Sequence, residues 1–567
     1  MRLLALAALS GLLLAGRAAA ALVPASCSAT RSCTAALNAA VAACGAAPCA
    51  ITLEAGTYIL EGAEYGPRVV VAGARGLSIT GAGDATVLVA NISTVFSVSA
   101  SEGVTFASFA VDMERVPFTA GRVVSATAQS SAVSFDATDL YRVELARHPW
   151  LARAQAIIAY DPVKQRFAAG TDIYALDAPI PIAFERTNGT DGLLHVATPL
   201  PVGEFVVLRH QVYAYNAFTV GASSGLTWTN VTLWAVGGMG ILTDSCTGIA
   251  IDGLRVVKQP GRPMSITADG VHFSNTRGGA ITVRRSTFEG QGDDGLNAPT
   301  QFQYLLSLAP DRRSFQVGGR NAPGAAAPYL ATGDTAQFFA RATLLPLGTA
   351  AVVGVGPNYT VLLSAPGVPA GVGMYDAVND AQQYAASLEV TDCVFRANRA
   401  RGVLLKQSNV LCARNTFEGM TAAAVLTNID ACYWLEGHPV SNWSFVDNVI
   451  REVNIWGGTA DIGIDNSVPV FAHGAPTTKC VPYALASPGA AVQRGLNISG
   501  NTITQVSGMP AVGAYSTDGL ELRGNTVTRG AGAPVPAVDL EGFGVVNAAL
   551  AGNVCDGRPC VAAGLGA

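Results

Sequence analysis

The chain has 567 residues, of which 50% are hydrophobic and only 13% are charged, and its net charge is -5. This composition excludes an intrinsically disordered chain, which combines low hydrophobicity with high charge. The slightly acidic balance and the scattered Lys and Arg residues provide no basic surface, so we expect no nucleic-acid partner. The 62 glycines suit a fold of short buried strands joined by turns.

The N-terminus has the pattern of a secretory signal peptide. Arg2 precedes an apolar stretch of the length of a signal h-region, and residues 18–20 (Ala-Ala-Ala) offer a small-residue cleavage site. A membrane anchor is the alternative, but Arg17 interrupts the run before the roughly 20 apolar residues that a span requires. We therefore predict a signal peptide over 1–20, a secreted protein and no membrane span.

The cysteines agree with a secretory route, as do six Asn-X-Ser/Thr sequons. In an oxidising compartment, clustered cysteines at the two ends of the chain are expected to form disulfides. The odd total of 11 leaves at least one cysteine unpaired within the chain. A zinc site is the alternative, but the spacings are irregular and histidines number only six, so we predict no metal and no cofactor. The cysteines expected to pair are Cys27, Cys33, Cys44, Cys49, Cys555 and Cys560.

The first residues after this leader predict a capping helix. Within 32–60, Leu37, Val41 and Ala42 follow a helical spacing, and short β-rich runs come directly after them. A solenoid has to cover its open end, and such a helix would do so. We therefore assign 21–149 to an N-terminal cap and the first coils of a solenoid.

Short strand phrases then recur along the chain, as in LEVTDCVFRAN and LELRGNTVTRG, each with two β-rich runs around a polar turn. Phe395 and Phe417 occupy equivalent positions 22 residues apart. A repeat of about 20 to 30 residues without intervening helices indicates a parallel β-helix. A β-sandwich is the alternative, but neither hairpin turns nor strict two-residue alternation dominates. Four turn asparagines are expected to stack at one corner and bond backbone there: Asn415, Asn448, Asn501 and Asn525.

Two stretches, 150–211 and 299–365, break the repeat. Both lose the Asn-turn phrase, and in the second the dipeptide Pro310-Asp311 sits between apolar runs as a hairpin turn would. A disordered loop is the alternative, but both stretches are rich in β-branched and aromatic residues. We predict two inserted antiparallel β modules, the second of which walls a groove. β-Helix coils are then expected over 212–298 and 366–567.

Three aspartates between residues 269 and 297 are the strongest candidates for catalysis. Asp293 and Asp294 are adjacent and flanked by glycines, and carboxylates are costly to bury unpaired. Paired carboxylates are what the cleavage of a glycosidic bond requires. Asp269 lies 24 residues before Asp293, about one coil, so both are expected on neighbouring rungs of one face.

Adjacent strand residues point to opposite faces, so Asp293 and Asp294 reach one groove only if Gly292 and Gly295 bend the chain. Crowding would also raise the pKa of one carboxyl, as a general acid requires. The alternatives are an Asx turn or a calcium site for the pair and a turn cap for Asp269. His272 is expected to support its neighbours through hydrogen bonds.

Several phrases, in order, carry a resemblance to a known family. They include VDMERVPFTAG, GEFVVLRHQVY, TADGVHFSNTRGG, FEGQGDDGLN, NRARGVLLKQSNVLCARNTFEG and DACYWLEGHPVSN. The series resembles glycoside hydrolase family 110, the exo-acting α-1,3-galactosidases, over roughly residues 32–550. The resemblance implies an all-β, pectin-lyase-like right-handed parallel β-helix with an N-terminal capping helix and two inserted small antiparallel β-barrel modules. It also implies hydrolysis of terminal α-1,3-linked galactose with inversion.

The segment GDTAQFF (333–339) departs from this family, whose members tend to carry more acidic residues there. It keeps Asp334 but has Gln337 at a position that is often acidic. If the general acid comes from this segment, either Asp334 supplies it or catalysis is impaired. The predicted catalytic residues are therefore Asp269, Asp293, Asp294 and Asp334.

An aromatic residue beside carboxylates suits a sugar, which stacks its apolar face on the ring and donates its hydroxyls to the acids. The alternative is an aromatic packed under a loop, with basic residues that merely pair with the acids. The predicted substrate-binding residues are His272, Asn297, Arg399, Arg401, Lys406, Asp430, Trp434 and Glu436.

Three functions are open at this point. The first is a secreted inverting exo-α-galactosidase acting on a galactose-containing glycan. The second is a pectin-type hydrolase or lyase on the same architecture, although the Gly-His-Gly and Arg-Ile-Lys motifs of galacturonases are absent. The third is a non-catalytic glycan-binding β-helix. The sequence also leaves a homodimer open.

Overall fold

A computed structural model describes residues 19–30, 33–63, 65–135, 145–184, 191–319, 325–472, 475–482 and 491–565. Residues 1–18 of the predicted signal peptide lie outside the described residues. Strand β1 (Ala19–Val23) begins at the last two predicted leader positions and pairs in parallel with β2 (Cys49–Leu53). Within the described ranges, every helix is too short or too polar to cross a membrane.

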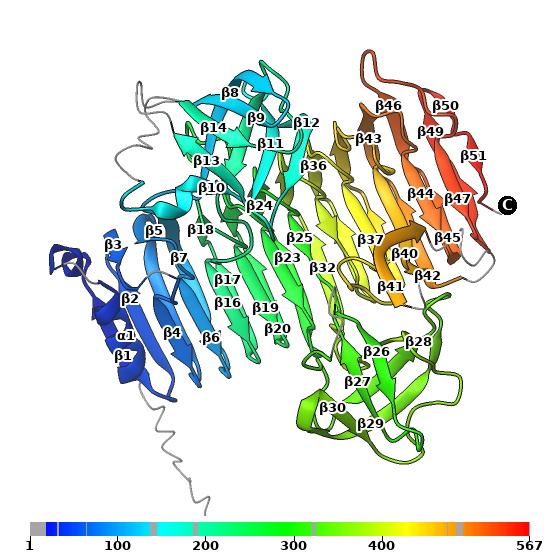
Figure 1. The fold of residues 1–567 in the computed structure, drawn as a ribbon, viewed down its shortest axis with the longest axis horizontal. Coiled ribbons are helices and arrows are strands. Elements are labelled where there is room, and N and C mark those ends of the chain that lie inside the picture. Colours follow the sequence, from blue (N-terminus) through cyan, green and yellow to red (C-terminus); the bar gives the residue numbers. More distant parts are fainter. Residues whose placement is uncertain are drawn as a thin grey trace, which may run out of the picture.

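The body of the molecule is a stack of coils, each of which contributes strands to parallel ladders (Figure 1). One coil consists of β22 (Val271–Ser274), β23 (Ala280–Arg284) and β24 (Thr287–Glu289), and β25 (Leu296–Asn297) begins the next. β22 pairs in parallel with β25, and β23 and β24 pair with strands of the following coil. The predicted parallel β-helix is confirmed.

The 13-stranded sheet forms one ladder. Its strands are β4 (Val69–Ala72), β6 (Phe96–Ser99), β16 (Phe218–Gly221), β19 (Ile241–Asp244), β22, β25, β34 (Val403–Leu404), β37 (Val425–Asp430), β40 (Ile462–Ala472), β44 (Val512–Tyr515), β47 (Leu540–Phe543) and β51 (Ala562–Ala563), with β41 (Ala475–Pro482) paired to β40.

The 24-stranded sheet contains the other ladders of the stack. Besides β1, β2, β23 and β24, its strands are β3 (Gly56–Leu60), β5 (Leu77–Ala90), β7 (Thr105–Met113), β17 (Ser224–Thr229), β18 (Thr232–Leu233), β20 (Thr247–Asp252), β21 (Arg255–Val256), β32 (Ser387–Thr391), β33 (Val394–Arg396), β35 (Val410–Ala413), β36 (Thr416–Glu418), β38 (Ser441–Val446), β39 (Val449–Arg451), β42 (Gln493–Ser499), β43 (Thr502–Gln505), β45 (Thr517–Arg523), β46 (Thr526–Arg529), β48 (Ala549–Ala551), β49 (Val554–Cys555) and β50 (Arg558–Pro559).

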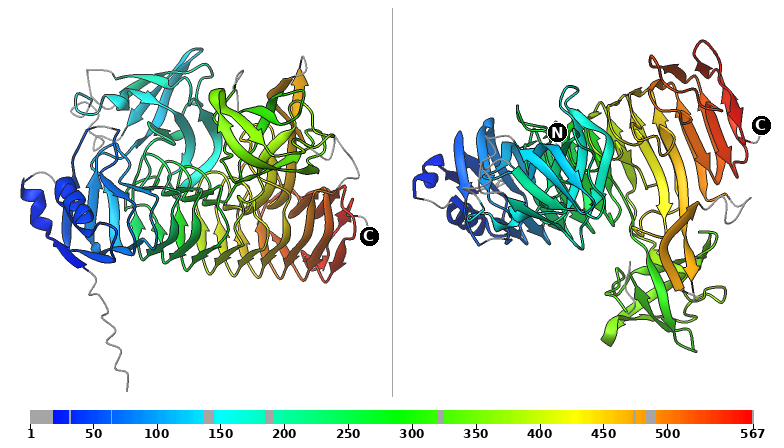
Figure 2. Two further views of the ribbon diagram at one scale, coloured as in Figure 1. Left: turned by 90° about the horizontal axis from the view of Figure 1, so that it is seen from below. Right: turned by 45° about the horizontal axis from the view of Figure 1, so that its top comes forward.

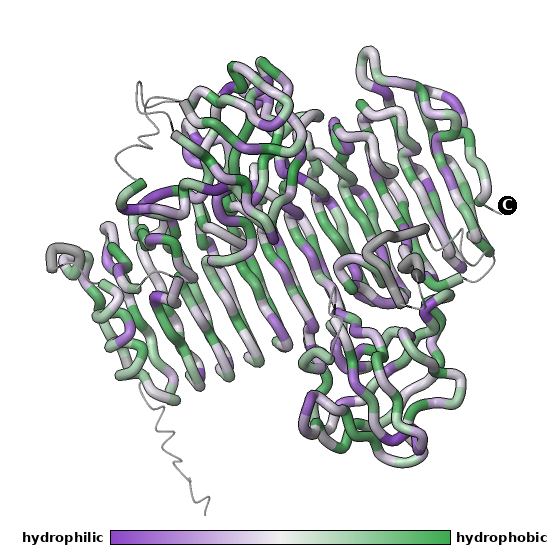
Figure 3. The backbone as a smooth tube through the Cα atoms, viewed as in Figure 1, coloured by the Kyte–Doolittle hydropathy of each residue, from purple (hydrophilic) through white to green (hydrophobic). Residues whose placement is uncertain are grey.

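Residues at equivalent coil positions stack inside the helix. Phe395 pairs with Phe417, as their spacing predicted, and the rings of Phe288, Phe395 and Phe417 stack at 4.8 and 5.1 Å. The strands alternate between apolar core residues and polar outer residues, which appears as alternating colours along the coils in Figure 3. Stacked rings and alternating strands therefore form one continuous core.

The predicted asparagine corner is also confirmed. Asn415 donates a side-chain hydrogen bond to the Asn448 carbonyl oxygen at 3.1 Å, and Asn448 donates in the same way to Asn501. Asn501 bonds Asn525, which bonds Asn553 on the next coil. Each amide also bonds backbone, so these buried side chains satisfy one another from coil to coil.

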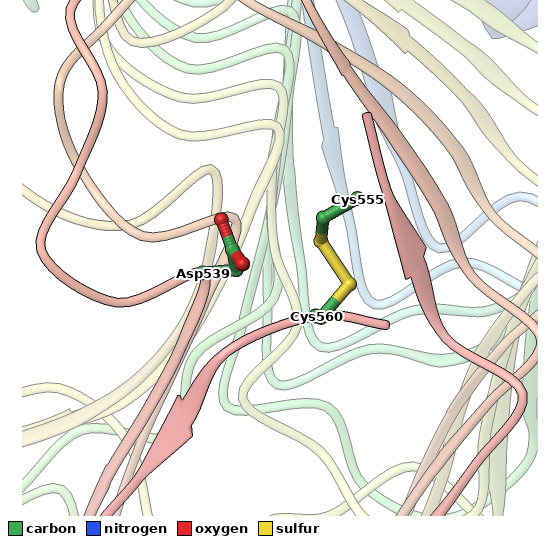
Figure 4. Close-up of side chains that lie close together, drawn as sticks. All are labelled: Asp539, Cys555 and Cys560. Atoms are coloured by element: carbon green, nitrogen blue, oxygen red, sulfur yellow. A yellow bond between two sulfur atoms is a disulfide. The ribbon is translucent and has the colours of Figure 1, made fainter. Parts of the chain in front are cut away.

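Both ends of the stack are closed by disulfides. At the N-terminal end the short 3-10 helix η1 (Ala25–Thr30) precedes the capping helix α1 (Cys33–Cys44), which buries Leu37, half-buries Val41 and leaves Ala42 exposed. Disulfides Cys27–Cys33 and Cys44–Cys49 anchor this cap. Disulfide Cys555–Cys560 lies beside Asp539 at the other end (Figure 4). The predicted end disulfides are thus confirmed, and the unpaired cysteines among the described residues are Cys246, Cys393 and Cys412, all buried.

The first inserted module is an eight-stranded antiparallel sheet that extends beyond the predicted 150–211. The hairpin of β8 and β9 belongs to it, because β8 pairs with β15 at the far end of the insertion. In sequence this hairpin resembles the coil strands before it. The module comprises β8 (Phe118–Thr127), β9 (Ser130–Phe135), the short helix η2 (Pro149–Ala152), β10 (Arg153–Ala154), β11 (Ala156–Asp161), β12 (Arg166–Tyr174), β13 (Ile180–Phe184), β14 (Asp191–His195) and β15 (Phe205–Arg209).

The second inserted module is a closed barrel. It extends beyond the predicted 299–365 because its last strand, β31, pairs with both β26 and β28 and closes the barrel. Both modules rise from the same side of the coil stack in Figure 2. The barrel elements are β26 (Gln303–Leu308), β27 (Ser314–Gly318), β28 (Thr335–Phe339), β29 (Pro346–Gly356), η3 (Pro357–Tyr359), β30 (Thr360–Leu363) and β31 (Ala377–Asp380).

Candidate active site

A cavity of about 770 Å³ lies on the outer side of the 13-stranded sheet, with walls from both inserted modules. The first module contributes Tyr174 and Leu176, and Tyr329 comes from the barrel insertion, so the expectation that the second module walls the site is met. The lining residues are Tyr174, Leu176, Tyr213, Met239, Leu242, Asp244, Asp269, His272, Ser274, Asp293, Asp294, Asn297, Gln301, Tyr329, Arg399, Arg401, Tyr433, Trp434 and Glu436.

The three predicted aspartates meet in this cavity, but their register differs from the prediction. Val271 pairs with Leu296, which sets a coil of 25 residues at this position. Asp269 therefore stands beside Asp294, not Asp293, and the N–H of Gly270 donates to the carbonyl of Asp294 at 2.9 Å. The extra residue shifts Asp293 one place further back along the turn.

Glycines let the coils approach closely where the aspartates are held. A Cβ added to Gly292 would lie 2.5 Å from the carbonyl oxygen of Thr267, and one added to Gly295 would lie 2.5 Å from that of Gly402. Neither glycine has a positive φ, so close approach, and not a left-handed turn, explains both residues. The chain bends here as predicted, but glycine is required because a side chain would collide with the neighbouring coil.

Asp293 is held as a carboxylate by three neighbours. The hydroxyls of Tyr174 and Tyr213 donate to Oδ2 at 2.7 and 2.5 Å, and Arg399 donates to Oδ1 at 3.1 Å. Burial alone would raise the pKa of Asp293, but the guanidinium groups of Arg399, Arg401 and Arg209 outweigh it and hold this pKa below its usual value. Asp293 is therefore a fixed negative charge.

Asp294 is held in the opposite protonation state. Its Oδ1 accepts from the backbone N–H of Arg401 at 2.8 Å, and its Oδ2 accepts from the Arg401 guanidinium at 3.0 Å. Burial raises the pKa of Asp294 to about 8, with the charges of Asp293 and Asp269 adding to burial and Arg401 opposing it. Two sequential carboxyls thus differ in charge near neutral pH, which is the usual sign of an acid and its partner.

Asp269 forms an ion pair with His272, whose Nδ1 lies 2.8 Å from Oδ2. Burial raises the pKa of Asp269, while the hydrogen bond from His272 acts in the opposite direction. For His272, burial lowers the pKa, but the bond and charge of Asp269 and the charge of Glu436 outweigh it, so its pKa is raised. The pair with Asp269 thus favours the charged form of the imidazole, and its hydrogen bond orients Asp269.

Glu436 lies on the other side of His272 and is also ionised. Lys406, only 1% exposed, donates to it at 2.7 Å, and the amide of Asn297 donates at 3.2 Å. Burial would raise the pKa of Glu436, but Lys406 and His272 keep it below its usual value. Asn297 and Glu436 line the cavity as predicted, whereas Lys406 stands behind Glu436 and positions it.

The carboxylates of Asp269, Asp293 and Asp294 each place an oxygen within 4.8 Å of the others. Such a cluster has the ligand chemistry of a hard cation. The charges of Asp269 and Asp293 are paired with His272 and Arg399, and Asp294 keeps its proton at neutral pH. The cluster therefore has partners within the protein for its charge.

Arg209 holds the turns that precede the aspartates and was not predicted. It is fully buried, and its Nη1 donates to the carbonyls of Thr267 and Gly292 at 2.8 and 2.6 Å. Its guanidinium carbon lies 4.6 Å from the ring of Tyr174, and that of Arg399 lies 4.3 Å from the same ring. The phrase GEFVVLRHQVY, which contains Arg209 and Tyr213, was the sequence signal for both residues.

Three aromatic residues line the cavity near its mouth. Tyr329, Tyr433 and Trp434 are 43%, 38% and 40% exposed, and Trp434 packs edge-on against Tyr213. Exposed rings beside carboxylates suit the apolar face of a sugar. The predicted placement of Trp434 beside the acids holds.

Asp430 does not line the cavity, contrary to the substrate-binding role expected for it. Its carboxylate accepts hydrogen bonds from the backbone N–H groups of Cys432, Tyr433 and Trp434 at 3.0, 2.8 and 3.1 Å. Asp430 therefore caps the turn that presents the two aromatic residues.

Asp334 also lies away from the cavity, so the structure gives no support to a catalytic role for it. Arg277 binds both of its oxygens at 2.8 and 2.9 Å and also reaches Asp380 at 3.0 Å. Burial would raise the pKa of Asp334, but Arg277 keeps it below its usual value. Gln337 accepts a hydrogen bond from Tyr384 and is likewise absent from the lining, so the departure in this segment does not alter the cavity.

Comparison with known proteins confirms the predicted resemblance. The α-1,3-galactosidase A of Streptomyces avermitilis is 24% identical over 397 residues, which cover 63% of this chain and 62% of that protein. The α-1,3-galactosidase B of Akkermansia muciniphila is 30% identical over 240 residues, which cover 41% of this chain and 30% of that protein. The match thus spans less than two thirds of the length of these relatives. No family model matches the chain.

Solved structures with similar architecture include a family 28 exopolygalacturonase from Yersinia enterocolitica, with a TM-score of 0.40, 11% identity, and coverage of 95% of this chain and 79% of that one. A polygalacturonase from Erwinia carotovora aligns with a TM-score of 0.37, 10% identity, and coverage of 96% and 95%.

Proposed function

We propose that the protein is an exo-acting glycoside hydrolase that removes terminal α-1,3-linked galactose with inversion of configuration. The observation that carries the proposal is the pair Asp293 and Asp294, two adjacent buried carboxyls in opposite protonation states on the floor of the cavity. The similarity to α-1,3-galactosidases supplies the sugar and linkage.

Asp294 is the general acid in this proposal. With a pKa of about 8 it keeps its proton at neutral pH. It donates that proton to the glycosidic oxygen as the bond between this oxygen and the anomeric carbon breaks. Asp294 keeps this proton because burial, and then the neighbouring charges of Asp293 and Asp269, oppose its ionisation.

Asp269 is the general base. A carboxylate with a raised pKa accepts a proton more readily, and His272 fixes its orientation. It takes a proton from the water that attacks the anomeric carbon, so the acid ends ionised and the base protonated. Asp293, tied by two tyrosines and an arginine, is a weak nucleophile and instead stabilises the positive charge that develops on the sugar.

The carboxylate spacing makes stereochemistry the sharpest test. Oxygens of the three aspartates approach within 4.8 Å. Inverting enzymes usually hold their two carboxyl groups about 6.5–9.5 Å apart and retaining enzymes about 5–5.5 Å. The anomer released first therefore distinguishes a water attack assisted by Asp269 from a covalent route through Asp293.

Walls on several sides support exo-action and a galactose-containing substrate. Tyr174, Tyr329 and Trp434 come from three different insertions or loops around one cavity. A cavity with walls on several sides suits the end of a glycan better than its middle. The three described end disulfides support a protein that works in an oxidising, extracellular setting.

The proposal is tested with purified protein and an α-1,3-linked galactosyl disaccharide, with the products followed by NMR from the first turnovers. Initial release of β-galactose supports the proposal, and initial release of α-galactose would replace inversion by retention. An unsaturated product from a uronic-acid polymer offered in parallel would identify a lyase, since elimination needs the acidic C5 proton of a uronate. Binding without turnover would identify a glycan-binding protein.

A further inference from the structure

A second cavity, of about 420 Å³, lies on the same outer sheet face as the candidate active site but further toward the C-terminus. We call it the C-terminal groove, and it is lined by residues that include Gly463, Asp465, Gly513, Tyr515, Glu541 and Phe543. Its volume falls in the range of about 300–1,000 Å³ that small-ligand sites occupy.

The register places both cavities on one column of residues. Asn297, which lines the active site, pairs with Leu404, and Leu404 pairs with Leu426. Leu426 pairs in turn with Gly463, and both line the C-terminal groove. Neighbouring strands lie about 4.8 Å apart, so three strand steps from β25 to β40 place the groove about 14 Å from the active-site coil.

The floor and the wall of the groove come from alternate residues of three successive strands. Gly463 pairs with Gly513, and Gly513 pairs with Glu541, so two neighbouring rungs present backbone instead of side chains. Two residues further along, Tyr515 pairs with Phe543 on the same face. The two glycines therefore leave a hollow with aromatic rings along one side.

The lining points to a neutral sugar. Its polar groups are chiefly acceptors, the carboxylates of Asp465 and Glu541, and the hydroxyl of Tyr515 lies 3.4 Å from Glu541. Among the described lining residues there is no Lys, Arg or His, which disfavours anionic ligands. Phe543 is 40% exposed and offers a ring for the apolar face of a pyranose, whose hydroxyls donate to the acids.

We propose that the C-terminal groove is a second glycan-binding site that holds a neutral sugar residue away from the bond being cleaved. This inference rests on the proposed function, because the active-site cavity on the same face supplies the reason for a glycan to lie there. The sugar belongs either to the glycan that is being trimmed or to a neighbouring chain of the same polysaccharide.

The test compares two substrates of the full-length protein, a nitrophenyl α-galactoside and a long glycan with terminal α-1,3-linked galactose. Phe543→Ala is expected to lower kcat/KM for the long glycan about tenfold, mainly through KM, since one stacked ring is worth that much affinity. The nitrophenyl substrate should change less than about twofold, because it is too short to span about 14 Å. Tyr359→Ala, an exposed aromatic of the barrel that lines neither cavity, is the matched control.

Equal losses on both substrates, or no loss on the long one, would overturn the second site while leaving the hydrolase intact. If the unaltered protein cleaves neither substrate, the proposed function fails, and calorimetric titration with a linear galactan hexasaccharide decides the groove alone. Binding that Phe543→Ala weakens would uphold the site. No binding, or displacement by tetramethylammonium but not by galactose, would overturn it.

Discussion

Two columns of stacked polar residues run along this β-helix and are balanced in opposite ways. The asparagine corner repeats one residue type, and each amide satisfies the next, from Asn415 to Asn553. At the active site, Asp269, Asp294 and Arg401 occupy equivalent places on successive coils, as the pairing of Val271, Leu296 and Val403 shows. Stacked amides satisfy one another's hydrogen bonds, whereas stacked carboxyls need cations or a bound proton to balance their charge. Repetition of one residue type therefore stabilises the stack, and a change of residue type within a column produces reactive groups.

The largest expected effect is on catalysis at the aspartate column. Asp294→Asn removes the proposed acid and should lower kcat for an α-1,3-linked galactoside by about 10²–10⁴-fold, the usual contribution of general acid catalysis. The melting temperature at neutral pH should not fall, because folded Asp294 is already uncharged and the amide removes the ionisation that favours the unfolded chain. Steady-state kinetics and thermal unfolding measured on one preparation check both parts. A large drop in melting temperature would make this residue part of the scaffold.

At the asparagine corner we expect a substitution to lower stability and to leave activity unchanged. Asn448→Ala removes the side-chain oxygen that accepts from the buried backbone N–H and from the side-chain amide of Asn415, which costs about 2–3 kcal/mol of stability. Denaturant unfolding measures this loss, and kcat should stay unchanged in the folded variant. A Ser444→Ala variant on the same coil, at a half-buried outer position, is the control and should lose far less. Loss of activity without loss of stability would contradict the division between the two columns.

The next test of the aspartate column is the pH dependence of activity and of stability. Activity requires protonated Asp294, so kcat/KM should fall about tenfold per pH unit above about pH 8 and remain level just below it. Stability should follow the same group. Native Asp294 keeps its proton up to about pH 8, whereas the unfolded carboxyl releases it near pH 4, so this group's contribution declines as pH rises through that window. Asp294→Asn should lack that decline, and unchanged pH profiles in both assays would refute the assignment.

A smaller effect is expected from the tyrosines that hold Asp293. Tyr174→Phe removes one hydrogen bond to Oδ2 but keeps the ring between Arg209 and Arg399. A hydrogen bond to a charged group is worth about 1.5–3 kcal/mol, but Tyr213 remains as a second donor, so kcat/KM should fall about tenfold at most. The double variant Tyr174→Phe/Tyr213→Phe should lose more than the product of the single effects. Strict independence of the two changes would show that they do not share Asp293.

Sequence reasoning reached the repeating parts of the molecule because repetition is local. The spacing of Phe395 and Phe417 and the recurring turn asparagines follow directly from the coil length. Adjacent carboxyls between glycines also stand out in a sequence of few charges. The register of Asp269 was missed by one residue, since only the pairing of Val271 with Leu296 reveals a coil of 25 residues.

Partners from distant segments could not be predicted in this way. Tyr174 reaches Asp293 across 119 residues, and Arg209 reaches Gly292 across 83. Asp334 was expected in the site on its segment alone, but its ion pair with Arg277 joins the barrel to the coil stack. Such contacts depend on how inserted modules fold back over the coils, and a linear pattern carries no information on that.

The site is built from two kinds of segment, the coils of the stack and the two inserted modules. The coils hold the carboxyls, while Tyr174 and Tyr329 belong to the inserted modules, which lie outside the core of the stack. Changes in the barrel insertion can therefore reshape the wall at Tyr329, whereas changes in the first module also reach Asp293 through Tyr174. In evolutionary terms, exchange of the barrel insertion alone is expected to change the glycans that the proposed hydrolase accepts more readily than mutation of its coils.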